Sequence, residues 1–370
     1  MTQEILQKNS IRPEVLSIEK YVAGKPISEV KRELGLDEVI KLASNENPLG
    51  CSPKAKEALK RVIDESSLYP DSSSYELKKA IANKLNVKEG QIFCGAGSDS
   101  LIKVICQTIL NPEDESIMGE VTFSRYEDNT KLMGGTVVKV PLKNNFLDIE
   151  AMVEKITPKT KVIWFCNPNN PTGGMFTGTE LNEVLHKIPK GVYIIMDEAY
   201  YEYVTDEDYP DSLKLLPEYP NMIILRTFSK AYGLASLRCG YGICHEELVQ
   251  YLNRVINPFD VNLFAQYAAI AALEDEEYLK LVHETNKEQK EYLLKAFDEM
   301  KLNYVPSNTN FIMVDVKGQD KFLFDYLLRK GIIIRPGFLL GMPGWLRVSI
   351  GTEYQNKKFI EELKQGIKKI

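Results

Sequence analysis

Residues 192–200 read VYIIMDEAY, an apolar run that ends abruptly in two acidic residues. Its β-branched and aromatic residues favour a buried strand. Similar short apolar runs flanked by turn residues occur at 91–94, 136–140, 161–166, 222–226 and 240–243. Stretches with helical spacing lie between several of these runs, at 100–110 and 179–187. This alternation predicts crossover units on a mostly parallel central sheet flanked by helices, which is an α/β fold.

The pattern changes after about residue 260. A long charged amphipathic helix is predicted over 282–300. It is followed by strand-like and helical segments at 310–316, 320–329, 332–335 and 346–350. We therefore expect three parts, which are an N-terminal arm at 1–40, a large domain at 41–265 and a small C-terminal α+β domain at 266–370.

Composition and charge exclude several classes of protein. The 370 residues are 44% hydrophobic and 26% charged, which is enough for a substantial core. The net charge of −6 offers no basic surface for nucleic acid. No apolar run approaches the roughly 20 residues of a membrane span, and residues 1–10 lack the apolar stretch of a signal peptide. Six scattered cysteines and three dispersed histidines favour reduced thiols in a cytoplasmic protein without a metal site.

The first of four polar segments reads CGAGSDS, at residues 94–100, between a predicted strand and a predicted helix. Glycines allow a tight turn, and the N–H groups at the start of the helix can bind an anion. A dinucleotide-binding fingerprint would need glycine in place of Ser100. Alone, the segment is equally compatible with a phosphate site and with an ordinary turn.

Two more polar segments each follow a predicted strand. Residues 166–174 read CNPNNPTGG, a loop at the carboxyl end of a strand, where parallel sheets bind ligands. A purely structural turn is the alternative. Asp197 ends the apolar run quoted first, and a carboxylate there is costly unless a cation such as a protonated pyridine nitrogen pairs with it. A helix-capping acid is the alternative for Asp197.

The fourth segment reads TFSKAYG, at residues 227–233, and Arg238 follows its lysine by eight residues. A lysine among small and apolar residues can have the lowered pKa that a Schiff-base amine needs. Ser229 and Arg238 are natural phosphate ligands. Lys230 could instead be an ordinary surface lysine, but the order of the four segments argues against that.

Together, NPTG at 170–173, DEAY at 197–200, Ser229-Lys230 and Arg238 resemble the class I and II aminotransferases, which are pyridoxal 5'-phosphate (PLP) enzymes of fold type I. The resemblance begins at about residue 41 and continues to the C-terminus. It implies a large domain with a mostly parallel central sheet, and a smaller α+β domain formed by the C-terminal part and the N-terminal arm.

The resemblance also implies roles for individual residues. Lys230 would form the Schiff base with PLP, and Asp197 would pair with its ring nitrogen. Asn170 and Tyr200 would bind the 3'-oxygen of the cofactor. Its phosphate would be held by Ser98, Asp99 and Arg238, together with Thr227 or Ser229. Phe123 would stack on the pyridine ring, with simple core packing as the alternative. The implied reaction is a ping-pong transamination, in which Lys230 moves the proton.

Further segments resemble the histidinol-phosphate aminotransferases, namely YVAGKP at 21–26, LASNENP at 42–48, LYPD at 68–71, IRPG at 334–337 and LRVSIG at 346–351. This resemblance implies a homodimer in which Tyr69 reaches the cofactor phosphate of the neighbouring subunit. The arm at 1–40 would pack with the small domain and the partner subunit. A tyrosine buried in its own subunit is the alternative for Tyr69.

Arg347 distinguishes the possible substrates. In amino-acid aminotransferases the matching arginine binds the substrate α-carboxylate. Histidinol phosphate has no carboxylate, so Arg347 would bind its phosphate, helped by Arg335 and Tyr21, with Asn45 also in the substrate site. The alternative for Arg335 is a surface ion pair. Ser100 departs from the family, which often has an acid at that position.

The implied reaction converts L-histidinol phosphate and 2-oxoglutarate to imidazole-acetol phosphate and glutamate, in histidine biosynthesis. A broad aromatic amino-acid aminotransferase could use the same arginine, and a PLP-dependent decarboxylase of a phosphorylated amino acid shares much of the pattern. A non-catalytic PLP-binding regulator is the alternative from another class. Such regulators usually carry a DNA-binding domain, and roughly 40 N-terminal residues are too few for one.

Overall fold

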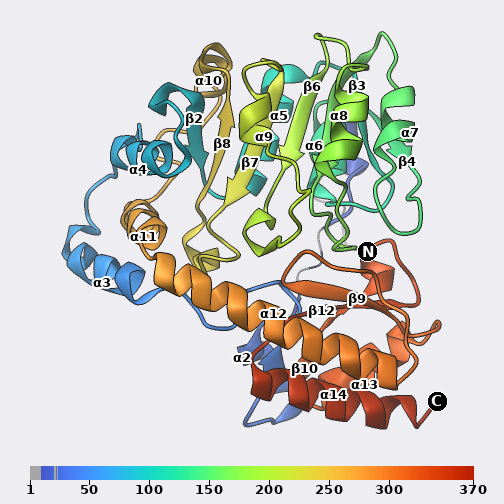
Figure 1. Ribbon diagram of the computed structural model, residues 1–370. Helices are drawn as coiled ribbons and strands as arrows, with labels where there is room; N and C mark the ends of the chain where they lie inside the picture. The colour runs from blue at the N-terminus through green and yellow to red at the C-terminus, as the bar shows by residue number, and fades with distance from the viewer. Residues whose placement is uncertain (1–9, 21, 23) are drawn as a thin grey trace.

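The computed structural model describes residues 10–20, 22 and 24–370. Its largest sheet has seven strands in the order β2-β8-β7-β6-β5-β3-β4 (Figure 1). The strand bounds are β2 Ile92–Gly95, β3 Glu115–Gly119, β4 Thr136–Val140, β5 Thr160–Cys166, β6 Tyr193–Asp197, β7 Met222–Thr227 and β8 Gly240–Cys244. Among them only β8 runs against the others, because it pairs antiparallel with both β2 and β7. The prediction of a mostly parallel sheet in an α/β fold is confirmed.

Helices surround this sheet and connect its strands (Figure 1). Their bounds are α3 Pro53–Arg61, α4 Tyr75–Leu85, α5 Ser98–Ile109, α6 Arg125–Leu132, α7 Ile149–Glu154, α8 Gly178–Leu185, α9 Ser212–Leu215, α10 Glu246–Leu252 and α11 Leu263–Leu273. The predicted helices at 100–110 and 179–187 correspond to α5 and α8. Strand β3 was not predicted, since it is short and contains Glu115 and Gly119. The composition of β3 alone does not favour a strand, and pairing with β4 and β5 on its two sides stabilises it.

The C-terminal part contains two small sheets. Strands β9 Phe311–Asp315, β11 Arg335–Pro336 and β12 Trp345–Ser349 form one of them, and β1 Ile40–Lys41 pairs with β10 Ile332–Ile333 in the other. Helices α12 Glu276–Glu299, α13 Asp320–Arg329 and α14 Glu353–Ile367 complete this part. The prediction of one strand at 332–335 was wrong, because the chain passes from one sheet to the other at Ile334. Helix α12 begins six residues earlier than 282, after its N-cap Asp275.

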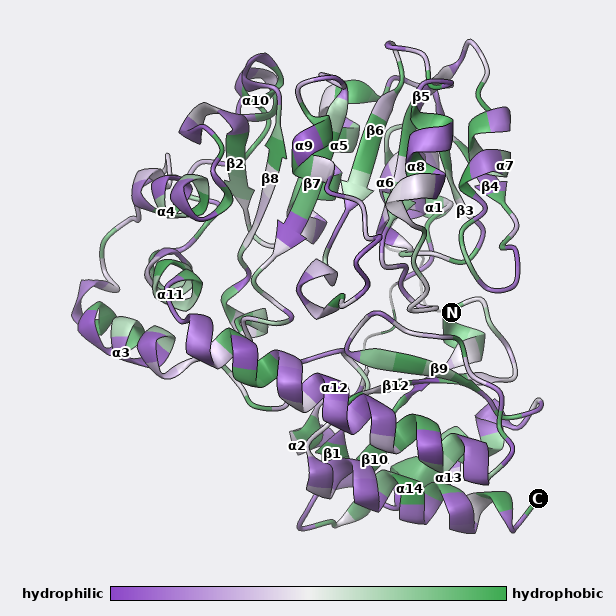
Figure 2. Ribbon diagram, in the orientation of Figure 1, coloured by the Kyte–Doolittle hydropathy of each residue, from purple (hydrophilic) through white to green (hydrophobic). Residues whose placement is uncertain are grey.

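The two largest hydrophobic clusters lie in different halves of the molecule. The larger lies on the seven-stranded sheet and contains residues from Ala55 to Leu273. The second joins Ile40 and Leu42 to residues from α12 through α14. Figure 2 shows apolar residues along the central strands and mixed polarity on the outer helices. The domain boundaries at residues 40 and 265 remain a prediction. The larger cluster continues through α11 to Leu273, and the second includes Leu42.

The described part of the N-terminal arm touches both halves. Its helix α1 Pro13–Leu16 contacts α6, and Arg12 donates a hydrogen bond to the carbonyl of Leu132 at 2.8 Å. Helix α2 Ile27–Leu34 buries Val30 against Ala43 of the small part. The arm therefore extends across the junction of the two halves.

The state of the cysteines and the character of the helices bear on the earlier predictions of reduced thiols and of no membrane span. All six cysteines are free thiols, and five of them are buried. None of the helices in the described residues has the length and apolar character of a membrane span.

Gly233 fixes the turn after Lys230 against the segment that follows β1. Its φ is +70°, and a Cβ there would lie 1.9 Å from the backbone oxygen of Gly50. We predict that Gly233→Ala lowers the free energy of unfolding by more than about 2 kcal/mol, measured by urea denaturation. Gly191→Ala is the control, because its Cβ would meet nothing within 4 Å. It should change stability by less than about 0.5 kcal/mol, and equal effects of both variants would refute the packing argument.

Candidate active site

A cavity of about 790 Å³ opens at the carboxyl ends of the parallel strands, where the two halves meet. Loops after β2, β3, β5, β6 and β7 form one wall, and residues of the small part form the other. Most of the residues singled out in the sequence line it, namely Asn45, Ser98, Asp99, Phe123, Asn170, Asp197, Tyr200, Thr227, Ser229, Lys230, Arg238, Arg335 and Arg347. Tyr69 lies elsewhere, and Tyr21 lies outside the described residues. Segments from the whole chain thus meet at one place.

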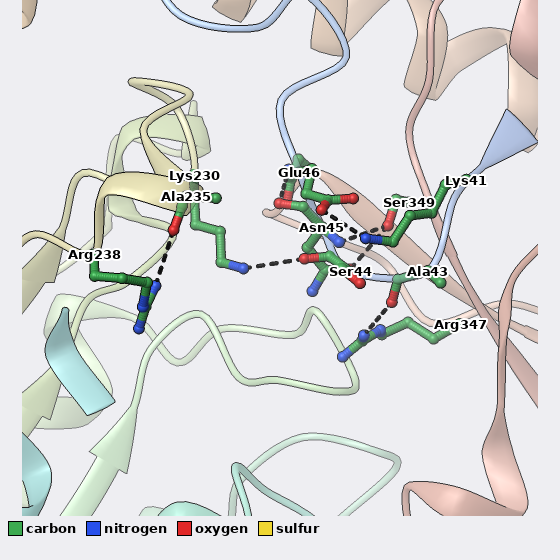
Figure 3. Close-up of polar contacts among 11 residues, drawn as sticks. Lys41, Ala43, Ser44, Asn45, Glu46, Lys230, Ala235, Arg238, Arg347 and Ser349 are labelled. Atoms are coloured by element: carbon green, nitrogen blue, oxygen red, sulfur yellow. Dashed lines mark hydrogen bonds and ion pairs between the residues drawn. The ribbon is translucent and has the colours of Figure 1, made fainter. Parts of the chain in front are cut away.

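Lys230 points into this cavity from the loop after β7 (Figure 3). Its Nζ donates a hydrogen bond to the carbonyl of Ser44 at 3.2 Å. Burial, with the positive charges of Arg347 and Arg238, lowers the pKa of Lys230 to about 8, and the charge of Glu46 opposes this fall. The alternative of an ordinary surface lysine is wrong. At neutral pH a useful fraction of this amine is unprotonated.

Asp197 is the last residue of β6 and is buried at the floor of the cavity. Burial raises the pKa of its carboxyl to about 6, although two hydrogen bonds oppose the rise. The donors are Tyr126 Oη, at 2.6 Å from Oδ2, and the backbone N–H of Ala199, at 3.2 Å from Oδ1. The 3₁₀ turn η4 begins only at Tyr201, so Asp197 does not cap a regular α-helix.

Tyr126 is a residue that the sequence analysis missed. It lies on α6 and is fully buried, with its ring stacked on Trp164 at 4.5 Å between centroids. The ring of Phe123 packs edge-to-face against the ring of Tyr126, with 5.8 Å between centroids, and Phe123 also lines the cavity. The polar composition of α6 conceals Tyr126, since its role depends on contact with β6. Its hydroxyl holds the Asp197 carboxyl from behind the cavity.

Two amide side chains connect the halves beside this carboxyl. Asn45, whose φ is +55°, donates from Nδ2 to Tyr200 Oη at 3.0 Å. Burial raises the pKa of Tyr200 to about 12, so its hydroxyl stays protonated at neutral pH. Asn170 accepts at Oδ1 from Arg347 Nη1 at 2.6 Å. Ser349 fixes Asn45 by donating to its Oδ1 at 3.0 Å.

The glycine-rich turn and Arg238 form an anion-binding corner. The first N–H groups of α5, at Ser98 and Asp99, have no partner within the helix and border the cavity. Gly97 has a φ of +84°, and a Cβ there would lie 2.5 Å from Arg238 Nη2. A Cβ on Gly240 would lie 2.4 Å from the nitrogen of Ser98. Only glycine permits these close approaches.

Two hydroxyl residues complete this corner. Ser229 Oγ lies 3.4 Å from Arg238 Nη1. Thr227 is buried, and its Oγ1 accepts the backbone N–H of Ser229 at 3.1 Å. Donors from two segments far apart in sequence therefore surround one anion-sized position.

Arg335 and Arg347 are directly opposite each other on antiparallel strands β11 and β12. Opposed residues project from the same face of a sheet, so both guanidinium groups face the cavity. Arg347 Nη2 donates to the carbonyl of Ala43 at 2.8 Å (Figure 3). Arg335 is 6% exposed and donates from Nη2 to the carbonyl of Val22 at 2.6 Å. This burial contradicts the alternative in that it removes Arg335 from the surface.

Tyr69 lies outside the cavity of its own chain. It is 82% exposed, and its ring stacks on Phe259 at 4.6 Å between centroids. The alternative of a buried tyrosine is wrong. Leu68, its neighbour in sequence, and Ile63 are also exposed.

The raised pKa of Asp197 predicts a pH-dependent stability. The folded state prefers the protonated acid, so its contribution to stability is present below pH 4 and is lost as the pH rises through 6. In the cofactor-free protein, Asp197→Asn should therefore raise the free energy of unfolding by about 3 kcal/mol at pH 8, with the gain shrinking toward pH 4. Urea denaturation across this range measures it. The exposed Asp325→Asn is the control, and a gain that does not vary with pH would contradict the assignment.

Known proteins resemble the chain over nearly its whole length. The model of the aminotransferase class I and II family matches residues 37–363. A histidinol-phosphate aminotransferase of Caldicellulosiruptor saccharolyticus is 51% identical over 96% of this chain and 99% of its own. One of Brevibacillus brevis is 48% identical over 95% and 96%.

Solved structures agree with these relatives. A histidinol-phosphate aminotransferase from Sinorhizobium meliloti in complex with pyridoxal-5'-phosphate has a TM-score of 0.90 at 25% identity, covering 97% of this chain and 98% of its own. A Thermus thermophilus aspartate aminotransferase with maleate has a TM-score of 0.82 at 22% identity, covering 96% and 99%, which shows the shared fold alone. The chain belongs to the class I and II aminotransferases of PLP fold type I, within the family of the histidinol-phosphate aminotransferases.

Proposed function

We propose that this chain is a PLP-dependent transaminase that converts L-histidinol phosphate and 2-oxoglutarate to imidazole-acetol phosphate and glutamate. The observation that supports this most strongly is the presence, in one cavity, of a lysine with a lowered pKa, a buried carboxylate and two opposed arginines. We further propose that it acts in the cytoplasm as a homodimer. The names of the 51% and 48% identical relatives support the same substrate.

The residues present fit PLP. Among residues 10–20, 22 and 24–370, the hydrogen-bond donors to Asp197 are Tyr126 and the Ala199 backbone, and burial without a paired cation raises its pKa. A pyridinium nitrogen would supply that cation. The donors at Ser98, Asp99, Ser229 and Arg238 would hold the cofactor phosphate, with Thr227 positioned beside them. Asn170 and Tyr200 would bind the 3'-oxygen, and Phe123 would cover the ring.

When bound, PLP supplies an electron sink for the charge that develops at the substrate α-carbon. Lys230 Nζ removes the proton from that carbon, because its lowered pKa leaves neutral amine available near pH 7 to 8. Asp197 remains ionised when a cation pairs with it, which keeps the ring nitrogen protonated. Tyr126 holds the carboxylate in place.

Arg347 and Arg335 determine which substrates fit. A phosphate dianion presents more oxygens than a carboxylate, and two opposed guanidinium groups match it. Glutamate and 2-oxoglutarate would place a carboxylate on Arg347. Asn45, which donates a hydrogen bond to Tyr200, also lines the cavity. Tyr21, which is predicted to bind the substrate, lies outside the described residues.

The exposed position of Tyr69 supports the homodimer. Its ring lies on the surface among exposed Leu68, Ile63 and Phe259, an arrangement suited to burial against a second copy. In such a dimer the Tyr69 hydroxyl would reach the cofactor phosphate of the partner subunit.

Replacing Lys230 tests the central assignment. Lys230→Ala should eliminate the visible absorbance of the lysine-bound cofactor and lower turnover by at least about 10⁴-fold, since it removes both the attachment point and the base. Lys290→Met is a matched control, because burial also lowers the pKa of Lys290 to about 8 while its Nζ bonds the carbonyl of Ser307, away from the cavity. Normal turnover by Lys230→Ala would refute the assignment.

Arg335→Gln tests the substrate. The KM for histidinol phosphate should rise about 10- to 100-fold, as expected for a lost charge-assisted hydrogen bond, and the KM for glutamate should change much less. Steady-state kinetics with both substrates and with phenylalanine measure this. Arg329→Gln, on the surface of α13, is the control. Efficient use of phenylalanine without turnover of histidinol phosphate by the unaltered enzyme would instead favour an aromatic amino-acid aminotransferase.

A further inference from the structure

The anion-binding corner is held from behind by a segment that the proposed mechanism does not use. Residues 257–262, here called the brace, form the second part of the connection from α10 to α11. Asp260 of the brace accepts two hydrogen bonds at Oδ2, from the backbone N–H of Ala96 at 2.8 Å and from Ser100 Oγ at 2.9 Å. Both donors belong to the glycine-rich turn and the first residues of α5.

The brace holds the opposite side of the corner as well. Asn262 donates from Nδ2 to the carbonyl of Leu237 at 2.8 Å, next to Arg238. The same asparagine caps α11 by accepting the N–H of Ala265 at 2.9 Å. One short segment therefore fixes both the backbone donors of α5 and the base of the arginine.

The geometry of the turn explains why such support is needed. Gly97 has a φ of +84°, and its N–H bonds the carbonyl of Gly95 at 2.7 Å. That tight turn directs the N–H groups of Ser98 and Asp99 toward the cavity. The N–H of Ala96 points the other way, toward Asp260, so it is not available to a bound anion. Without an acceptor behind the turn, this N–H would be unpaired at a partly buried position.

The contact also gives a physical reason for serine at position 100. An acid there would place a second carboxylate beside Asp260, and like charges at hydrogen-bonding distance repel strongly. A serine hydroxyl donates to the carboxylate instead. Ser100 and Asp260 form a complementary pair in this chain.

We infer that Asp260 is a positioning residue, which holds the turn at residues 95–97 so that the N–H groups of Ser98 and Asp99 face the cofactor phosphate. This inference rests on the proposed use of PLP. Asp260 does not touch the phosphate, because it lies on the other side of the turn and has the same sign of charge. Its effect is therefore on phosphate binding through backbone geometry.

Binding of PLP and of pyridoxal, which lacks the phosphate, to the cofactor-free full-length protein tests this inference. Asp260→Ala should weaken PLP binding about 10- to 100-fold, as expected when a carboxylate acceptor of two hydrogen bonds is removed. Pyridoxal binding should change less than about threefold, since it makes no use of the turn. Absorbance titration measures both dissociation constants.

Two further variants separate positioning from general damage. Asp260→Asn retains an oxygen acceptor and should bind PLP within about threefold of the unaltered protein. Asp148→Ala removes a carboxylate that accepts the N–H of Ala151 at 3.0 Å at the start of α7, outside the residues that line the cavity, and should leave PLP affinity unchanged.

Equal weakening of PLP and pyridoxal by Asp260→Ala would overturn the inference, as would unchanged PLP binding. Loss of affinity in Asp260→Asn as large as in Asp260→Ala would also contradict an acceptor role. Failure of the unaltered protein to bind PLP would refute the proposed cofactor instead, so the two failures are distinguishable.

Discussion

The site depends on a carboxylate held at the end of a buried central strand. Successive residues along an extended chain point to opposite sides, so Asp197, which ends β6, and Glu198, which follows it, face different surroundings. Asp197 faces the cavity, while Glu198 turns away to Arg226, which donates to it at 2.9 Å from Nε and 2.8 Å from Nη2. Glu198 thus has its cation within the protein. Within the part of the chain that the structure describes, Asp197 has hydrogen-bond donors but no paired cation, and burial raises its pKa to about 6.

Packing of the two halves brings the other charged groups to this carboxylate. The segment after β1 belongs to the small part and supplies the carbonyl of Ser44 to Lys230. Asn47 from the same segment donates to the carbonyl of Ala231 at 2.8 Å. Arg347 reaches across to Asn170. The active site is therefore a property of the junction, and a change that shifts one half would misplace the arginines relative to the lysine.

The sequence was sufficient to predict residues whose surroundings are local. The loops after β5, β6 and β7 follow apolar strands directly, so their polar residues had to meet at one edge of the sheet. The resemblance then assigned their roles. The antiparallel direction of β8 was not predictable, since the hydrophobic pattern of a strand does not encode its direction. Strand β3 was missed because its neighbours, rather than its own residues, stabilise it.

Local sequence patterns also could not predict the residues that act through a neighbouring residue. Tyr126 looks like one residue of a polar helix, and only the contact between α6 and β6 gives its hydroxyl a partner 71 positions away. Asp260 is separated by 160 positions from Ser100, and the serine seemed only a departure from the family pattern. Both residues lie one layer behind the cavity, where side-chain identity is set by three-dimensional contact.

The charges around Lys230 imply that the pKa of this lysine changes when anionic ligands bind. Arg347 and Arg238 both lower the pKa of this lysine, because each places a positive charge near its ammonium form. An anion bound to either arginine offsets that charge, so the pKa of Lys230 should rise when the anionic groups are in place. Anions bound to these arginines would thus make the amine more basic at the moment when it must take a proton. Burial is the largest cause of the lowered pKa of Lys230, and the cations around the cavity, which we propose to bind the substrate, adjust that pKa.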